Sequence, residues 1–293
     1  MSGSKRVDFI GIGSGKCGST WLYENLVKHP RICDRNLKEL NYFSDLYDEH
    51  PFSWYENQFC DCADGLLRGE FSVTYLGHPE APARVRRHYP DARLLAIVRE
   101  PVRRTFSNYL HAIRKGDVSP RTSFAEFYAD EANLVPARYA DHVERWLALF
   151  PREQLHVVIL EEFLRDQLAG YRRLFEFLGV DADFVPPDYA KRSNEARSYR
   201  FLWIENTLVR TYRFLSRRGY TRLVKRIVDS RVGEIVRSIN AVDREGPRLT
   251  PTDRAALVTY FAPHNARLSH LLGHDLSAWD APARTQDAAA SRE

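Results

Sequence analysis

Short apolar runs alternate with amphipathic stretches along most of this chain of 293 residues. The runs at 7–12, 93–98 and 155–160 are mostly apolar and end at turn residues, which is typical of buried strands, and 66–75 alternates weakly and predicts a further strand. Helical spacing of apolar positions predicts helices over 21–28, 79–88, 105–115, 123–129, 138–149, 168–178 and 251–272, with a helical region up to about residue 240. Buried strands separated by helices indicate the α/β class, with a central parallel sheet and helices on both faces.

No repeat and no linker divides this pattern. We expect a single domain over residues 1–280, with a helical, basic portion at about 200–280, and a disordered tail over 281–293. The hydrophobic content of 44% supports a sizeable core. No stretch of about 18 apolar residues predicts a membrane span, and the first residues do not have the form of a signal peptide. We therefore expect a soluble, cytoplasmic protein.

Charge and cysteine content narrow the classes of partner. The net charge is +4, and residues 200–248 carry twelve Lys or Arg against five Asp or Glu. This basic stretch matches no nucleic-acid motif, so no nucleic-acid partner is expected, and a solvated helical face or a nearby anionic ligand both fit it. Cys60 and Cys62 are too close for a usual zinc pair, and no metal is predicted. Together with Cys17 and Cys33 they are expected to be thiols in a reducing compartment.

The loop GIGSGKCGSTW at 11–21 lies between a predicted strand and a predicted helix, and it allows three interpretations. A Walker A loop would need glycine at Ile10 and a hydroxyl at Cys17, so two of its fixed positions fail. The spacing of the glycines in this loop matches a dinucleotide-binding fingerprint, and Asp34 follows downstream, but this signal is weak on its own. The match leaves an NAD(P)-dependent oxidoreductase as an alternative.

The third interpretation uses the lysine of the loop. Lys16 is followed by Gly18, Ser19 and Thr20 at the start of the predicted helix. Backbone N–H groups of the first helical turn and the two hydroxyls can surround a terminal phosphate, helped by the helix dipole. Lys16 would then lie where negative charge gathers on a leaving group.

A second candidate phosphate site follows the strand predicted at 93–98. Arg99 comes directly after that strand, Glu100-Pro101 follows, and Ser107 lies eight positions after the arginine. Pro101 can start a helix, Arg99 offers a forked donor to a phosphate, and Ser107 adds a hydroxyl two turns along. Neither the Walker nor the dinucleotide interpretation explains this second motif.

The two motifs, in this order, resemble those of sulfotransferases that use 3′-phosphoadenosine-5′-phosphosulfate (PAPS). The similarity is greatest to bacterial and heparan-sulfate-type sulfotransferase domains, whose K-E-type and G-E-type segments are similar to KELNYFSD at 38–45 and GEFSVTYL at 69–76. The resemblance implies a P-loop-like three-layer sandwich and PAPS as co-substrate. The residues that it implies for nucleotide binding are Lys16, Cys17, Gly18, Ser19, Thr20, Trp21, Arg99 and Ser107. Arg192 or Arg197, in KRSNEARSYR at 191–200, is a candidate for a further contact with the nucleotide.

For the chemistry, the resemblance implies in-line transfer of a sulfuryl group to a hydroxyl of a small-molecule or carbohydrate acceptor, with an amine as the less favoured alternative. Lys16 would stabilise the leaving oxygen and Glu39 would be the general base. Apolar neighbours of Glu39 are expected to desolvate it partly; an exposed surface charge is the alternative. Lys38, Phe71 and Ser72 are the predicted acceptor contacts.

Two positions depart from the resembled pattern: Phe71 stands where the polysaccharide enzymes often have lysine, and Asn41 where they often have histidine. A non-catalytic nucleotide-binding protein of the same fold therefore stays an alternative. His50, His78 and His88 are further base candidates without a matching context. The sequence sets no expectation for the oligomeric state.

Overall fold

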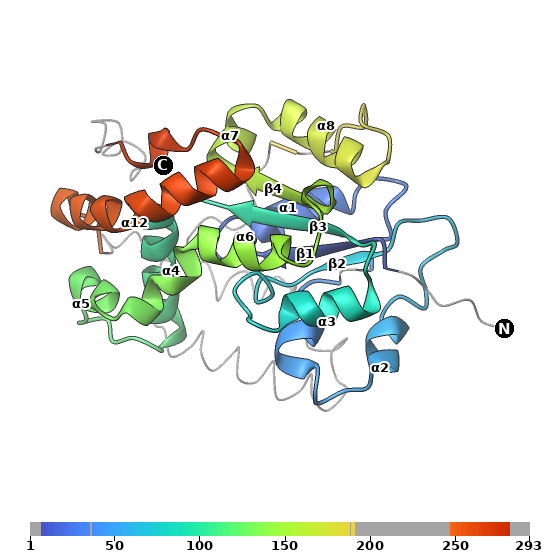
Figure 1. The fold of residues 1–293 in the computed structure, drawn as a ribbon, viewed down its shortest axis with the longest axis horizontal. Coiled ribbons are helices and arrows are strands. Elements are labelled where there is room, and N and C mark those ends of the chain that lie inside the picture. The colour runs from blue at the N-terminus through green and yellow to red at the C-terminus, as the bar shows by residue number, and fades with distance from the viewer. Residues whose placement is uncertain (1–6, 36, 188, 191–246, 282–293) are drawn as a thin grey trace, which may run out of the picture.

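A computed structural model describes residues 7–35, 37–187, 189–190 and 247–281. Within these ranges the centre of the fold is a 4-stranded sheet in the order β2-β1-β3-β4 (Figure 1). All three strand pairs are parallel. Helices flank the sheet, so the predicted α/β class is confirmed. The strands are β1 (Phe9–Gly13), β2 (Gly69–Phe71), β3 (Arg93–Val98) and β4 (Leu155–Ile159).

The helices predicted within the described residues are present, and besides four short 3-10 turns three further short elements were not predicted. These three are a π-helical turn at Tyr42–Leu46, α2 (Phe52–Asn57) and α7 (Leu160–Arg165), which begins directly after β4. The other helices of the described residues are α1 (Ser19–Leu26), α3 (Ala81–His88), α4 (Pro101–Lys115), α5 (Phe124–Ala129), α6 (Tyr139–Leu147), α8 (Gln167–Leu178) and α12 (Pro251–Leu272).

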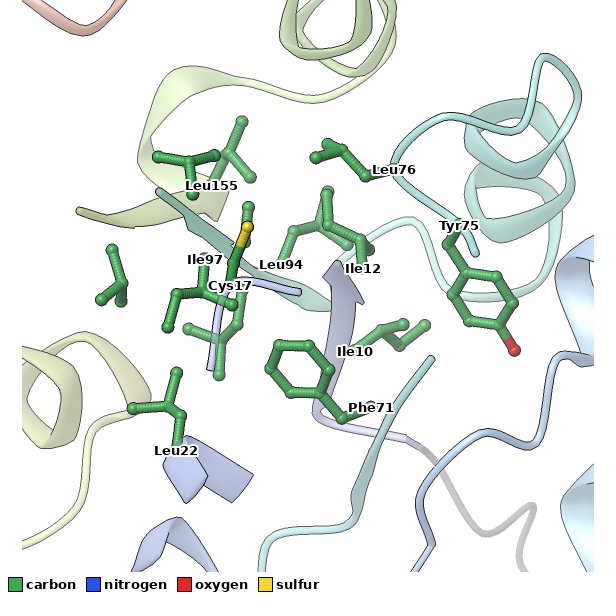
Figure 2. Close-up of a cluster of buried hydrophobic side chains, with 14 of the residues drawn as sticks. Ile10, Ile12, Cys17, Leu22, Phe71, Tyr75, Leu76, Leu94, Ile97 and Leu155 are labelled. Atoms are coloured by element: carbon green, nitrogen blue, oxygen red, sulfur yellow. The ribbon is translucent and has the colours of Figure 1, made fainter. Parts of the chain in front are cut away.

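Strand β1 lies between β2 and β3, and every residue in it is buried. Gly11 lets β2 approach closely, because a Cβ atom there would lie 2.1 Å from Cδ2 of Phe71. Figure 2 shows the Phe71 ring within the cluster of core side chains, while the hydroxyl of Tyr75 points away from this cluster. The carboxyl ends of these parallel strands lead into the two predicted phosphate motifs.

Helix α4 is fixed at its start by the carboxylate of Glu100. This side chain caps the helix by accepting the Arg103 N–H at 2.9 Å, and it pairs with Arg254 of α12 at 3.4 Å. Glu100 and Arg254 are both buried. Helix α12 also crosses α6 (Figure 1), so the described C-terminal helix braces the segment that follows Arg99.

The cysteines differ from the expectation of four thiols. Cys33 and Cys62 form a disulfide, with Cα atoms 5.7 Å apart. The prediction was wrong for this pair because the chain after α1 runs beside the chain before β2, where Cys33 N–H donates to Leu67 O at 2.9 Å. Cys17 is a buried thiol, and Cys60 is exposed outside the disulfide.

Parts of the predicted organisation lie outside the described residues. These are the basic portion up to residue 246 and the tail from 282, so both stay predictions, as does the extent of the domain. Among the residues that are described, no helix is both long and apolar enough to cross a membrane.

Candidate active site

The loop between β1 and α1 leaves the start of a helix open. Gly18 is the N-cap of α1, with φ of +86°, a backbone conformation that favours glycine, and no side chain caps the helix. A Cβ at this position would also approach Leu160 to 3.2 Å. The first N–H groups of α1 thus have no side-chain cap, and their binding of a phosphate stays a prediction.

The side chains of the loop divide into two groups. Cys17 is buried and its thiol contacts the Tyr139 hydroxyl at 3.5 Å, and Trp21 packs against Phe163 and Tyr171. Cys17 therefore offers only backbone groups to a ligand, whereas the buried indole N–H of Trp21 has no hydrogen-bond partner among the described residues. Lys16 and Thr20 are half-buried, whereas Ser19 is buried at the helix start.

Arg99 and Lys16, which belong to separate motifs, lie next to each other. Arg99 Nη1 donates to the carbonyl oxygen of Lys16 at 3.5 Å. Arg104, one turn into α4, donates through Nε to the carbonyl oxygen of Gly15 at 3.4 Å. The Arg104 side chain is buried, and its Nη1 has no hydrogen-bond partner among the described residues. Such a buried cationic donor fits an anionic ligand.

Helix α4 contributes further polar groups to this region. Ser107, His111 and Arg114 follow at spacings of four and three, so they share one face of the helix, and all three are half-buried. Burial, followed by the charges of Arg114, Arg104 and Arg99, lowers the pKa of Lys16 to about 8. Burial and the charge of Lys16 lower the pKa of His111 to about 4, so its imidazole is neutral at pH 7. Arg104, His111 and Arg114 were missed, although the helical spacing from Ser107 could have indicated the last two.

Glu39 is held at the edge of β2 by backbone pairing. Phe71 N–H donates to Leu37 O at 3.1 Å, and Glu39 N–H donates to Phe71 O at 2.8 Å. The Glu39 carboxylate pairs with Lys38 and accepts the Val73 N–H at 3.2 Å. Its side chain is 37% exposed.

The Glu39 side chain is thus partly exposed, and its partial desolvation by apolar neighbours stays a prediction. Leu37, Tyr42 and Phe43 instead belong to the buried core. The backbone turns sharply here, with φ of +59° at Glu39 and +53° at Asn41.

Lys16 and Glu39 come from separate segments that meet at Val73. A Cβ at Gly15 would lie 3.6 Å from Cγ2 of Val73, and the N–H of Val73 donates to Glu39. The structure thus brings the residue before Lys16 and the Glu39 carboxylate to the same residue, Val73. No stretch of sequence links these segments, so only the fold shows their proximity.

Two predicted acceptor contacts are placed differently from the expectation. The Phe71 side chain is fully buried beneath Gly11, and Ser72 is fully buried with its hydroxyl donating to Glu70 Oε2 at 2.6 Å. Both positions argue against side-chain contact with an acceptor, because both side chains are fully buried. Lys38 is largely buried, with its ammonium 5.9 Å from the centre of the Phe71 ring.

The positions of the two remaining predicted nucleotide contacts are not described. Arg192 and Arg197 lie outside the described residues. In the described part of the chain, no group of three His, Cys, Asp or Glu side chains is arranged to hold a metal ion.

The sequence of this chain matches the model of a known protein family. The sulfotransferase domain model matches residues 6–200, which is more than half of the chain. The chain therefore belongs to the sulfotransferase domain family. A crystal structure of a sulfotransferase from Alicyclobacillus acidocaldarius is 28% identical, with a TM-score of 0.68, and the match covers 94% of this chain and 99% of that one.

The curated relatives include enzymes of heparan sulfate. The human bifunctional heparan sulfate N-deacetylase/N-sulfotransferase 3 is 26% identical over 92% of this chain and 31% of its own length. The human heparan sulfate glucosamine 3-O-sulfotransferase 3B1 is 31% identical over 61% of this chain and 48% of its own. The chain thus spans less than half of these relatives. Mouse sulfotransferase SULT7A1, complexed with PAP, shares the fold at a TM-score of 0.52 and 16% identity, covering 91% of this chain and 87% of that one.

Proposed function

We propose that this protein transfers a sulfuryl group from PAPS to a hydroxyl of a carbohydrate or small-molecule acceptor. The observation that carries the proposal is the contact between Arg99 Nη1 and the carbonyl oxygen of Lys16, at 3.5 Å. It joins two phosphate motifs more than eighty positions apart in the sequence. A co-substrate with phosphate groups at both its 3′ and 5′ positions needs two such sites side by side. The heparan sulfate enzymes among the relatives support a carbohydrate acceptor.

The residues of the site divide the chemistry between them. The N–H groups at the start of α1 and Lys16 hold the 5′-phosphosulfate, and Lys16 meets the charge that forms on the bridging oxygen as the bond from sulfur to that oxygen breaks. Arg99 and Ser107 hold the 3′-phosphate. Glu39 accepts the proton of the acceptor hydroxyl as its oxygen forms the new bond to sulfur.

A nucleotide-binding screen tests the proposal against its alternatives. Adenosine 3′,5′-bisphosphate is expected to stabilise the protein strongly, because ligand at about 100 times its dissociation constant adds roughly 2.7 kcal/mol. Melting temperatures are compared with ADP, NAD and NADP as controls. An equal shift with NAD would favour the oxidoreductase alternative, and no shift with the bisphosphate would remove the proposal.

Turnover distinguishes an enzyme from a non-catalytic nucleotide-binding protein. PAPS is supplied with a panel of 4-substituted phenols and N-acetylglucosamine–glucuronate oligosaccharides, and released adenosine 3′,5′-bisphosphate is measured. Strong nucleotide binding without release for any acceptor would support the non-catalytic alternative.

Removing the Arg99 guanidinium is expected to act on one phosphate alone. A hydrogen bond to a charged group is worth about 1.5–3 kcal/mol, so Arg99→Ala should weaken binding of adenosine 3′,5′-bisphosphate by about ten- to a hundredfold. Binding of 5′-AMP, which has no 3′-phosphate, should change little. Calorimetric titration of both nucleotides measures the difference, and equal losses would show that Arg99 acts through the loop at Lys16 instead.

The lowered pKa of Lys16 predicts a pH dependence of nucleotide binding. A bound phosphate favours the ammonium form, which is already present below pH 8. Above that pH each binding event must take up a proton, so affinity is expected to fall by up to about tenfold per pH unit. Phosphate monoesters keep their charge here because their second pKa is about 6.

Lys16→Arg is the matched control, because its guanidinium stays charged. Its affinity for adenosine 3′,5′-bisphosphate should be flat between pH 7.5 and 9.5 in the same titrations. A wild-type affinity that is equally flat would contradict this role of Lys16.

A further inference from the structure

A buried glutamate lies close enough to Glu39 for its pKa to be raised by the Glu39 charge, and the chemistry proposed above does not use it. Glu70 belongs to β2 and is fully buried. Its carboxyl receives hydrogen bonds from Ser72 at 2.6 Å and from Tyr55 at 3.4 Å, and the Tyr75 hydroxyl lies close enough to lower the pKa of this carboxyl. A carboxyl group taken out of water is costly unless its oxygens are bonded in this way.

Two of these three hydroxyls make a second bond. Ser72 Oγ accepts the N–H of Asn41 at 3.0 Å, and the Tyr75 hydroxyl accepts the N–H of Phe43 at 3.3 Å. An amide N–H can only donate, so each hydroxyl keeps its own hydrogen for Glu70. The carboxyl is thus linked, through one hydroxyl on each side, to two backbone groups of the segment that follows Glu39.

That segment has a backbone that needs support. Glu39 and Asn41 both have positive φ, which is uncommon for residues with a side chain, and the π-helical turn Tyr42–Leu46 begins directly afterwards. Such a conformation persists only where the surroundings hold it. The two amides bound through Ser72 and Tyr75 lie within this stretch.

We propose that Glu70 is a positioning residue for Glu39, acting through Ser72 on the N–H of Asn41 and through Tyr75 on the N–H of Phe43. This role rests on the proposed function, in which Glu39 is the general base. A base must be within hydrogen-bond reach of the proton that it removes, and a displacement of about 1 Å can lower a rate by about 10²-fold.

The electrostatics agree with this geometry. Burial raises the pKa of Glu70 to about 8, while the bonds from Ser72 and Tyr75 act in the opposite direction and the charge of Glu39 raises it. Glu70 is therefore largely protonated at neutral pH, and it adds little negative charge beside Glu39. A protonated carboxyl still has lone pairs on both oxygens and can accept the two hydroxyl hydrogens.

Amide hydrogen exchange tests the linkage without any acceptor. In the full chain, Ser72→Ala is expected to speed exchange at Asn41, and Tyr75→Phe at Phe43, each by about tenfold, while Glu70→Gln affects both amides. Tyr55→Phe is the matched control, because it also removes a hydroxyl bonded to Glu70 but has no bond to this segment. Unchanged exchange in Ser72→Ala and Tyr75→Phe, or an equal effect of Tyr55→Phe, would overturn the proposal.

Turnover tests the consequence for the base, with PAPS and phenols of increasing acidity. Ser72→Ala and Tyr75→Phe should lower kcat by ten- to a hundredfold for the least acidic phenol and less for 4-nitrophenol, with KM for PAPS unchanged. Ser72→Thr, which keeps the hydroxyl, should restore kcat, and Tyr55→Phe should keep it. Equal losses for all phenols would indicate a general structural defect and would overturn the positioning role.

Glu39→Gln separates failure of this inference from failure of the proposed function. If Glu39→Gln lowers kcat but Ser72→Ala and Tyr75→Phe do not, only the role of Glu70 is wrong. If Glu39→Gln has no effect on kcat, the assignment of the base is wrong, and the positioning role, which depends on it, is overturned with it. If Glu70→Gln does not fold, the two hydroxyl variants still decide the question.

Discussion

Glu39→Gln is expected to bind adenosine 3′,5′-bisphosphate almost as wild type and to lose turnover by about 10² or more, the usual range for a lost general base. The amide keeps the size of the side chain but cannot accept the proton. Nucleotide binding should be preserved because the carboxylate contacts Lys38 and Val73 rather than the N-terminus of α1. Calorimetry and single-turnover rates with PAPS measure the two quantities separately.

Lys16→Ala is the contrasting variant. It should lose turnover and nucleotide affinity together, because its ammonium bonds to oxygens that are present before the reaction begins. Without nucleotide it should be at least as stable as wild type, since the change removes a cation held near three arginines. Thermal unfolding without ligand therefore separates a lost contact from a failure to fold.

The acidity of the acceptor distinguishes the loss of turnover in Glu39→Gln from that in Lys16→Ala. A phenol with an electron-withdrawing group needs less help with its proton, so it should partly rescue Glu39→Gln and should not rescue Lys16→Ala. Undiminished turnover in Glu39→Gln would assign the base elsewhere. His111 is then the next candidate, because its neutral imidazole lies near Lys16, whereas His88 is bound to the Tyr47 hydroxyl at 2.9 Å and His50 stacks on Trp54.

The elements that the sequence predicted best are those whose signal is local. Strand β3 has the bounds predicted for 93–98, and α12 those predicted for 251–272. A strand buried on both faces must be apolar over its whole length, and a proline with a capping threonine marks the start of α12. The π-helical turn at Tyr42–Leu46 has no such local signal, because its amides are bonded to hydroxyls about thirty positions away.

The site residues also differ in whether a local sequence signal predicts them. Lys16 and Arg99 could be predicted because each lies in a short motif directly after a strand. Glu70 could not, because its environment depends on Tyr55, Ser72 and Tyr75, whose hydroxyls meet only after folding. Ser72 was predicted to contact the acceptor because its segment could be identified from the sequence. The direction of its side chain could not, because it depends on how the chain is packed directly after β2.

The disulfide leads to the prediction with the largest effect on stability. Cys33 and Cys62 are 29 positions apart. The chain-entropy estimate is about 3 kcal/mol for a loop of 15 residues and about 4.7 kcal/mol for one of 100, so this loop should contribute about 3–4 kcal/mol. Reduction with a phosphine should therefore lower the urea midpoint of the purified protein clearly. Cys60→Ser should behave as wild type, and the double variant Cys33→Ser, Cys62→Ser should not respond to reductant.

The closed loop contains Lys38, Glu39 and Asn41, so its loss should also loosen the segment that carries the proposed base. Hydrogen exchange at Asn41 is expected to rise on reduction in the wild type and not in the double variant. Disulfides are rare in a reducing cytoplasm, and thiols trapped by alkylation during lysis reveal the state of this pair in the cell. Four alkylated thiols in denatured protein, together with an unchanged urea midpoint after reduction, would contradict the disulfide and agree with a cytoplasmic location. Two alkylated thiols would instead place the protein in an oxidising environment.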